Sequence, residues 1–195
     1  MKSRSLMVFA LLAAAACGGK KPVETPAPAP APTAIDSTAI KARMRQDSIN
    51  AAEARTRAAA DAAARAAAQA QSQLAAELSS MINFDYDKSD IKPEYQANLD
   101  RKAAILKANP ALTIQIAGNC DNRGSDEYNL ALGNRRAAAS QRYLINQGVA
   151  ASQISIVSYG EERPVNPADN EAAWAQNRND QFTPTAGGNN LMAPK

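Results

Sequence analysis

Apolar and polar residues alternate in three short runs of the chain, and each run predicts a strand. The runs cover residues 81–85, 111–117 and 154–160, and an apolar residue at every second position is typical of a strand with one buried face. In other segments the apolar positions recur every three or four residues. This spacing predicts helices over about 93–108, 125–146 and 170–178, followed by a last strand over 181–185.

Single residues predict how these elements begin, end and pack. Ser125 is a candidate N-cap, and Gly148 is a candidate C-cap of the same helix. Pro184 cannot donate a hydrogen bond in a central ladder, so the last strand is predicted to be short or at a sheet edge. Trp174 is the expected core anchor of the short helix, and residues 186–195 are expected to form a loose tail.

The segment before residue 81 has a composition that cannot build a core. Residues 17–36 are rich in Pro and Ala, which predicts an extended polyproline tether. Residues 37–80 contain no helix breaker, and pairs such as Glu53 and Arg57 place the acid first at the favourable i, i+4 spacing. We expect a solvated helical spacer, about 60 Å long at about 1.5 Å per residue. The alternative, a basic nucleic-acid-binding arm, is disfavoured by the acidic residues among the basic ones.

The N-terminus resembles a bacterial lipoprotein signal. Lys2 and Arg4 precede an apolar run over 6–16, which is too short to anchor stably across a bilayer. By this resemblance residues 1–16 are removed, Cys17 receives the acyl chains, and Gly18 directs the protein to the outer membrane. Several acyl chains on one residue give durable anchoring. The alternative is an ordinary secreted protein that is cut after an A-x-A pattern.

The composition of the chain excludes several kinds of catalytic and metal-binding site. Among its 195 residues the chain has no His, which excludes a histidine base and histidine-ligated metals; no metal and no cofactor are predicted. The net charge of +3 is too small to indicate nucleic-acid binding. If Cys17 is lipidated, Cys120 has no partner within the chain. We expect a buried thiol there, the alternative being an intermolecular disulfide in an oxidising periplasm.

The stretch 116–137 carries the densest pattern in the chain. It leads from a predicted strand, through a polar turn, into the helix that Ser125 caps. It resembles the signature of the OmpA-like C-terminal domain of peptidoglycan-associated lipoproteins, G-H-x-D-x-R-G followed by Y-N-x-x-L-[SG]-x-x-R-A. The matching residues are Gly118, Asp121, Arg123, Gly124, Tyr128, Asn129, Leu132, Gly133, Arg136 and Ala137. The resemblance extends over about 81–182, with two departures: Asn119 replaces the usual His, and 179–180 replace a second Arg and its apolar neighbour.

The resemblance implies an α+β domain over 81–185 with the order β-α-β-α-β-α-β and helices on one face of a mixed sheet. It also implies a ligand, the meso-diaminopimelate of the peptidoglycan stem peptide, whose free end carries an ammonium and a carboxylate. Asp121 would accept the ammonium, and Arg136 would hold the carboxylate, ideally through two parallel bonds. Leu132 would pack on the ligand's methylenes. The remaining candidate residues, on the far side of the pocket and in its loop, are Tyr86, Asp87 and Asn119.

Three functions are compatible with these residues. The first is a non-enzymatic outer-membrane lipoprotein that binds peptidoglycan and, by resemblance, Tol-type periplasmic partners, with roles in envelope integrity and cell division. The second is a structural lipoprotein whose ligand site has drifted, as the changes at Asn119 and at 179–180 together suggest. The third is a peptidoglycan hydrolase that uses an acid pair such as Asp85 and Asp87, or Asp121 and Asp126. Each candidate residue also has a purely structural alternative, such as a turn or a surface charge.

Overall fold

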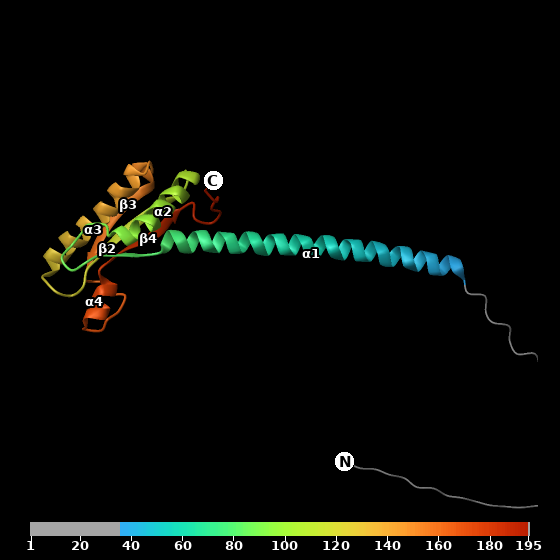
Figure 1. The fold of residues 1–195 in the computed structure, drawn as a ribbon, viewed down its shortest axis with the longest axis horizontal. Coiled ribbons are helices and arrows are strands. Elements are labelled where there is room, and N and C mark those ends of the chain that lie inside the picture. Colours follow the sequence, from blue (N-terminus) through green and yellow to red (C-terminus); the bar gives the residue numbers. More distant parts are fainter. Residues whose placement is uncertain (1–35, 195) are drawn as a thin grey trace, which may run out of the picture. The chain divides into compact units, whose positions relative to one another are not determined.

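The computed structural model describes residues 36–194 (Figure 1). The predicted signal segment 1–16, the lipidation site Cys17 and nearly all of the Pro-rich tether lie outside these residues. The chain divides into two units, 1–50 and 51–195, which are considered separately. None of the helices in the described range is both long and apolar enough to cross a bilayer.

The predicted spacer is a single helix, α1 (Ser37–Ser79). The carboxylate of Asp36 accepts hydrogen bonds from the backbone N–H groups of Thr38 and Ala39 at 3.0 and 3.3 Å, and this caps its N-terminus. In the first unit every described residue is exposed. In the second unit α1 stays exposed up to about residue 70, and its last turns then bury Leu74 and Leu78. The core therefore begins earlier than Met81.

The buried end of α1 is capped by a lysine from another helix. The Nζ of Lys102 donates to the carbonyl oxygens of Glu77 and Leu78 at 2.6 and 2.8 Å and to Ser80 Oγ at 2.9 Å. Burial lowers the pKa of Lys102 to about 7. These contacts satisfy carbonyls that have no partner within a helix end, and so they fix the last turn of α1 to the domain.

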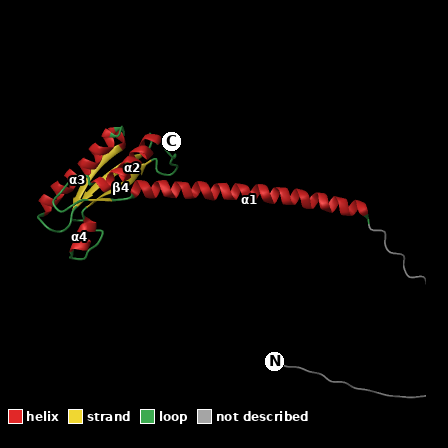
Figure 2. Cartoon of the chain, in the orientation of Figure 1, coloured by secondary structure: helices red, strands yellow, loops and turns green. Residues whose placement is uncertain are grey.

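The sheet contains β1 (Ile82–Asn83), β2 (Thr113–Asn119), β3 (Ile154–Gly160) and β4 (Asn179–Ala186). Its order is β1-β4-β2-β3, with β2 and β3 parallel and the other pairs antiparallel. Figure 2 shows the strands in yellow and the helices in red. A mixed sheet with helices is the predicted α+β class. The ends of β2 and of the short β1 lead into the loops that carry the candidate site residues.

The predicted position of the last strand was wrong. β4 is eight residues long and lies between β1 and β2. Pro184 is nevertheless tolerated because β1 pairs only with Asn179 and Asp180 of β4. At Pro184 the strand has a single neighbour, β2, where Ile114 is its partner. On the side of β4 away from β2, no strand lies alongside Pro184 that would need its missing N–H as a donor.

The helical elements of the domain are η1 (Pro93–Tyr95), α2 (Gln96–Ala108), α3 (Asp126–Asn146), η2 (Ala151–Gln153) and α4 (Glu171–Asn177). α2 and α3 lie over one face of the sheet (Figure 1). The predicted cap of α3 is confirmed, since Ser125 Oγ accepts from the N–H of Tyr128 at 3.3 Å. The helices and the sheet enclose a core whose fully buried members include Ile82, Leu99, Ile105, Leu106, Leu112, Ile114, Ile116 and Leu144.

Two further expectations from the sequence were wrong. Trp174 does not anchor α4 in the core; its neighbour Ala173 is buried instead, and Trp174 is only half-buried. The tail is also not loose, because Leu191 is buried in the core. Gln71 exchanges two hydrogen bonds with the backbone of Leu191 at 2.5 and 2.8 Å, and Asn109 does the same with Met192 at 2.9 and 2.7 Å. The side-chain amides of Gln71 and Asn109 thus make the hydrogen bonds that a neighbouring strand would otherwise make with the tail.

Candidate functional site

A pocket lies where the end of β2, the start of α3 and the loop after β1 meet, and its volume is about 160 Å³. Five of the six predicted pocket residues line it: Tyr86, Asp87, Asp121, Leu132 and Arg136. It is also lined by six residues that the prediction did not assign to the site, namely Cys120, Arg123, Gly124, Tyr128, Asn129 and Arg178. The fold therefore brings the predicted residues together from three separate segments.

Asp121 is a buried carboxylate held by two arginines. Its Oδ1 accepts from the backbone N–H and the Nε of Arg123, both at 3.2 Å. Its Oδ2 accepts from Arg123 Nη2 at 2.8 Å and from Arg178 Nη1 at 3.1 Å. Burial alone would raise the pKa of Asp121, but the bonds from Arg123 and Arg178 outweigh it and hold this pKa below its usual value. The group is therefore an anion at neutral pH.

Arg136 is fully buried and ties three backbone segments together. Its Nε donates to the carbonyl oxygen of Lys88 at 2.8 Å, its Nη1 to that of Asn119 at 2.8 Å, and its Nη2 to that of Asp85 at 3.2 Å. A further Nη1 contact reaches Cys120 Sγ at 3.3 Å. Burial lowers the pKa of Arg136. The two parallel bonds that we expected it to offer a carboxylate are therefore not available in this arrangement.

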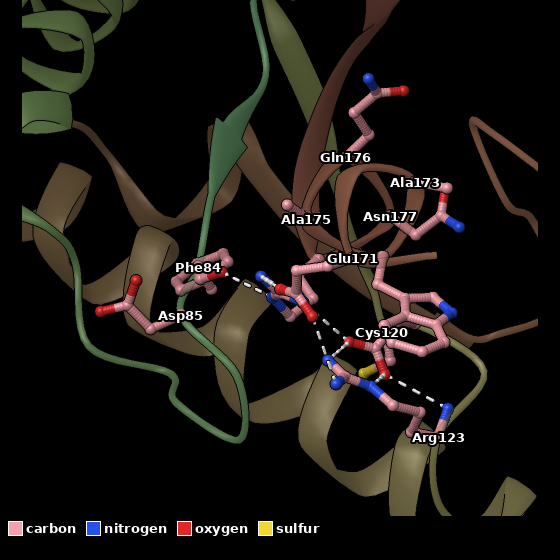
Figure 3. Close-up of polar contacts among 12 residues, drawn as sticks. Phe84, Asp85, Cys120, Arg123, Glu171, Ala173, Ala175, Gln176 and Asn177 are labelled. Carbon is pink, nitrogen blue, oxygen red and sulfur yellow. Dashed lines mark hydrogen bonds and ion pairs between the residues drawn. The ribbon is translucent and has the colours of Figure 1, made fainter. Parts of the chain in front are cut away.

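Arg123 forms the outer wall of the pocket between two aromatic rings. The carbon at the centre of its guanidinium lies 4.2 Å from the ring centroid of Tyr86 and 4.2 Å from that of Trp174, within the range of cation–π attraction. Its Nη1 also reaches Glu171 Oε2 at 3.4 Å, and Figure 3 shows both residues in this network. Trp174 thus supports Arg123, which lines the pocket, without lining the pocket itself.

Asp87 and Tyr128 meet at the pocket mouth. Asp87 has a left-handed backbone, with φ of 54°, which is a costly conformation for a residue other than glycine. The hydroxyl of Tyr128 donates to Asp87 Oδ1. This contact joins the loop after β1 to the first turn of α3. Tyr86 is more than half exposed at the same mouth.

Asn119 is the one predicted pocket residue whose side chain does not line the pocket. It is buried, and its amide nitrogen donates to the carbonyl oxygen of Ala117 at 3.1 Å and to Asn179 Oδ1 at 2.9 Å. The two departures from the family signature are thus in direct contact, behind the pocket. Asn119 contributes through its backbone, whose carbonyl accepts from Arg136.

Signals for the missed residues were present in the sequence. Arg123, Tyr128 and Asn129 all belong to the matched signature, and Arg178 matches an Asn-Arg pair of the same family. Asn129 donates to Glu161 Oε2 at 2.6 Å and to the carbonyl of Asp121 at 3.2 Å, so it shapes the loop.

Cys120 is a buried thiol as expected, and burial raises its pKa to about 11. In the range 36–194, no cluster of acidic or cysteine side chains suits a metal ion.

The second departure places a carboxyl group in the core. Asp180 is fully buried; its Oδ2 accepts from Ser140 Oγ at 2.5 Å, and its Oδ1 has no partner. Burial raises the pKa of Asp180 from 3.8 to about 7. Between pH 4 and pH 7 the folded state thus binds more protons at this site than the unfolded state. Its contribution to stability is greatest at low pH and is lost as the pH rises towards 7.

We expect Asp180→Asn to remove this pH dependence. The free energy of unfolding of the variant, minus that of the wild type, should grow by about 3 kcal/mol between pH 4 and pH 7. Urea denaturation at several pH values measures this difference, and Asp100→Asn at the exposed end of a Tyr143 hydrogen bond is the control. A difference that stays constant with pH would show that Asp180 titrates normally.

Comparison with known proteins identifies the class to which this fold belongs. The OmpA family model matches residues 83–178. The C-terminal domain of Helicobacter pylori MotB has a similar structure, with a TM-score of 0.52, 23% identity and coverage of 57% of this chain and 88% of that one, a likeness that concerns the fold alone. The domain is thus of the OmpA type.

More similar relatives define the family within that class. The crystal structure of the peptidoglycan-associated lipoprotein from Burkholderia pseudomallei shares 44% identity and a TM-score of 0.53 with this chain, over 54% of this chain and 89% of that one. The peptidoglycan-associated lipoproteins of Pseudomonas putida and Pasteurella multocida are 56% and 50% identical over 95 and 97 residues. The chain belongs to the peptidoglycan-associated lipoprotein family. These matches span 49% and 50% of this chain and 57% and 65% of the two relatives.

Proposed function

We propose that this chain is a non-enzymatic outer-membrane lipoprotein that binds peptidoglycan non-covalently through the diaminopimelate of the stem peptide. The observation that carries the proposal is the pocket itself, which places the anionic Asp121 beside the buried cation Arg136 and the apolar Leu132. A zwitterionic ligand end needs one anion and one cation at fixed positions, and charge-assisted bonds give such recognition both strength and geometry.

The position in the envelope follows from the N-terminus. In this proposal residues 1–16 are removed, Cys17 carries the lipid anchor in the outer membrane, and the domain binds the cell wall from the periplasmic face. The names of the relatives support an association with peptidoglycan. Tol-type periplasmic proteins remain proposed partners, with roles in envelope integrity and cell division.

The two alternative functions have less support. A drifted site is suggested by Asn119 and by the change at 179–180, but none of these residues lines the pocket, and the side chain of Asn119 bonds that of Asn179. A hydrolase needs one carboxyl that holds a proton at working pH, whereas the bonds from Arg123 and Arg178 keep the pKa of Asp121 low. Binding without cleavage thus fits the pocket best.

Co-sedimentation with purified sacculi tests the proposal. The full-length chain in mild detergent should sediment with diaminopimelate-type sacculi, and Asp121→Asn should weaken binding by about 10- to 100-fold, as expected for loss of a charged hydrogen-bond partner. Asp126→Asn is the matched control, because Asp126 is exposed and lies outside the pocket.

Three results would contradict the proposal. They are a wild-type chain that stays in the supernatant, equal losses for both variants, and release of soluble muropeptides by the purified chain. The last of these would favour the hydrolase.

A further inference from the structure

The carboxylate of Asp121 has no room for an additional donor. It accepts four hydrogen bonds, two on each oxygen, from Arg123 and Arg178. A carboxylate offers about four lone-pair sites. A ligand ammonium can therefore reach Asp121 only if one of the present donors leaves.

Arg136 is also almost fully occupied. A guanidinium carries five N–H groups, and four of those of Arg136 contact the carbonyls of Lys88, Asn119 and Asp85 and the thiol of Cys120. One N–H on Nη2 remains. A ligand carboxylate has two oxygens, so it needs a second cation nearby.

Arg123 is the donor that can leave. Arg178 is buried, with 8% of its side chain exposed, and it also donates to the carbonyl of Phe84 at 3.0 Å and to Glu171 at 3.1 Å. The side chain of Arg123 is 29% exposed. Its two aromatic neighbours hold the guanidinium by its faces, so its N–H groups can turn to a new acceptor while the stacking is kept.

We propose that Arg123 is a specificity-determining residue that exchanges ion-pair partners when the ligand binds. This inference rests on the function proposed above. The ligand ammonium takes the place of the Arg123 guanidinium on Asp121. The freed guanidinium, still between Tyr86 and Trp174, then pairs with the ligand carboxylate together with the one remaining N–H of Arg136.

The exchange selects for a zwitterion. A stem peptide that ends in lysine brings an ammonium but lacks the neighbouring carboxylate. If this ammonium displaces Arg123, the guanidinium loses its close anion and gains none, apart from the exposed Glu171 at 3.4 Å. A diaminopimelate end supplies both charges, so the ion pairs lost are replaced. Arg123 thus penalises the ligand that carries only the ammonium.

Isothermal titration of the full-length chain with two muramyl tripeptides tests this inference. One peptide ends in meso-diaminopimelate and the other in L-lysine. We expect the wild type to prefer the first by about tenfold or more. In Arg123→Gln the diaminopimelate peptide should bind more weakly, whereas the lysine peptide should bind as well as or better than before. The preference should thus fall below about threefold.

Arg163→Gln is the matched control, because Arg163 also stacks on a tyrosine, Tyr159, at 3.5 Å but lies outside the pocket. It should keep the wild-type preference. If Arg123→Gln weakens both peptides equally, Arg123 only shapes the loop and the inference is wrong. An unchanged preference in Arg123→Gln would also overturn it. If the wild type binds neither peptide, the proposed function itself fails.

Trp174 gives an independent readout of the exchange. It is the only tryptophan of the chain, and its ring faces the guanidinium that changes partner. The diaminopimelate peptide should change the tryptophan emission of the wild type but not that of a folded Arg123→Gln variant. An equal change in both would contradict the movement of Arg123.

Discussion

Gly133→Ala is expected to lower the free energy of unfolding by about 3 kcal/mol or more, although alanine normally stabilises a helix interior. A Cβ at this position of α3 would lie 2.3 Å from Ser158 Oγ and 2.7 Å from the carbonyl oxygen of Gly118. The second of these is backbone of β2 and cannot move aside without the strand. α3 and β2 touch through these two glycines, and Gly118→Ala should be more damaging still, with its Cβ 1.9 Å from the Gly133 oxygen.

Urea denaturation of the purified chain measures this effect. Asn134→Ala is the control, because Asn134 is the exposed next residue of the same helix; it should be neutral or stabilising by about a few tenths of a kcal/mol. If Gly133→Ala were as stable as the control, the close approach of α3 and β2 would be incorrect. The geometry of the pocket depends on that approach, because β2 leads to Asp121 and α3 carries Arg136.

Arg136→Leu should cost about 4 kcal/mol of stability, through the loss of a buried cation whose partners stay behind. The carbonyl oxygens of Lys88, Asn119 and Asp85 would each lose a donor at a buried or half-buried site. Thermal unfolding followed by circular dichroism measures the change. Loss of peptidoglycan binding by an Arg136 variant therefore reports on ligand contact only if the variant is shown to be folded.

The neighbouring arginine provides the control. Arg135 is exposed and lies over the ring of Tyr128 at 5.7 Å, so Arg135→Leu should change stability by less than about 1 kcal/mol. Equal stability of the Arg135 and Arg136 variants would contradict the structural role of Arg136.

Much of the fold was predictable because local signals and tertiary contacts agree. The alternation in 154–160 corresponds to β3, and Ser125 caps α3 as its sequence context indicates. Helix α1 was predictable from composition alone. In each case the residues of one continuous segment determine the element, without a contribution from distant parts of the chain.

The wrong predictions share a cause, which is that they depend on distant partners. The place of Pro184 follows from the length of β1, about a hundred residues earlier. The tail is held by Gln71 and Asn109, whose amides carry no sequence signal for this role. Trp174 stacks on Arg123, so its place depends on a contact between α4 and the loop after β2.

The site was predicted as a set of residues but not as a network of charges. The resemblance identified Asp121, Arg136 and Leu132, and the pocket contains them. It did not indicate that Arg123 and Arg178 already saturate Asp121. Asn119 was misplaced, since a strand-end residue faces either the pocket or the sheet interior, and the register decides which.

The most direct test of the central proposal is a nitrogen-15 NMR titration of the full-length chain in detergent with the diaminopimelate muramyl tripeptide. The proposal predicts saturable shifts of the backbone amides of Asp121, Arg123 and Tyr128, and of the Trp174 side-chain N–H, with no shifts in residues 37–70. A titration without saturable shifts, or with shifts confined to surfaces away from this pocket, would contradict it.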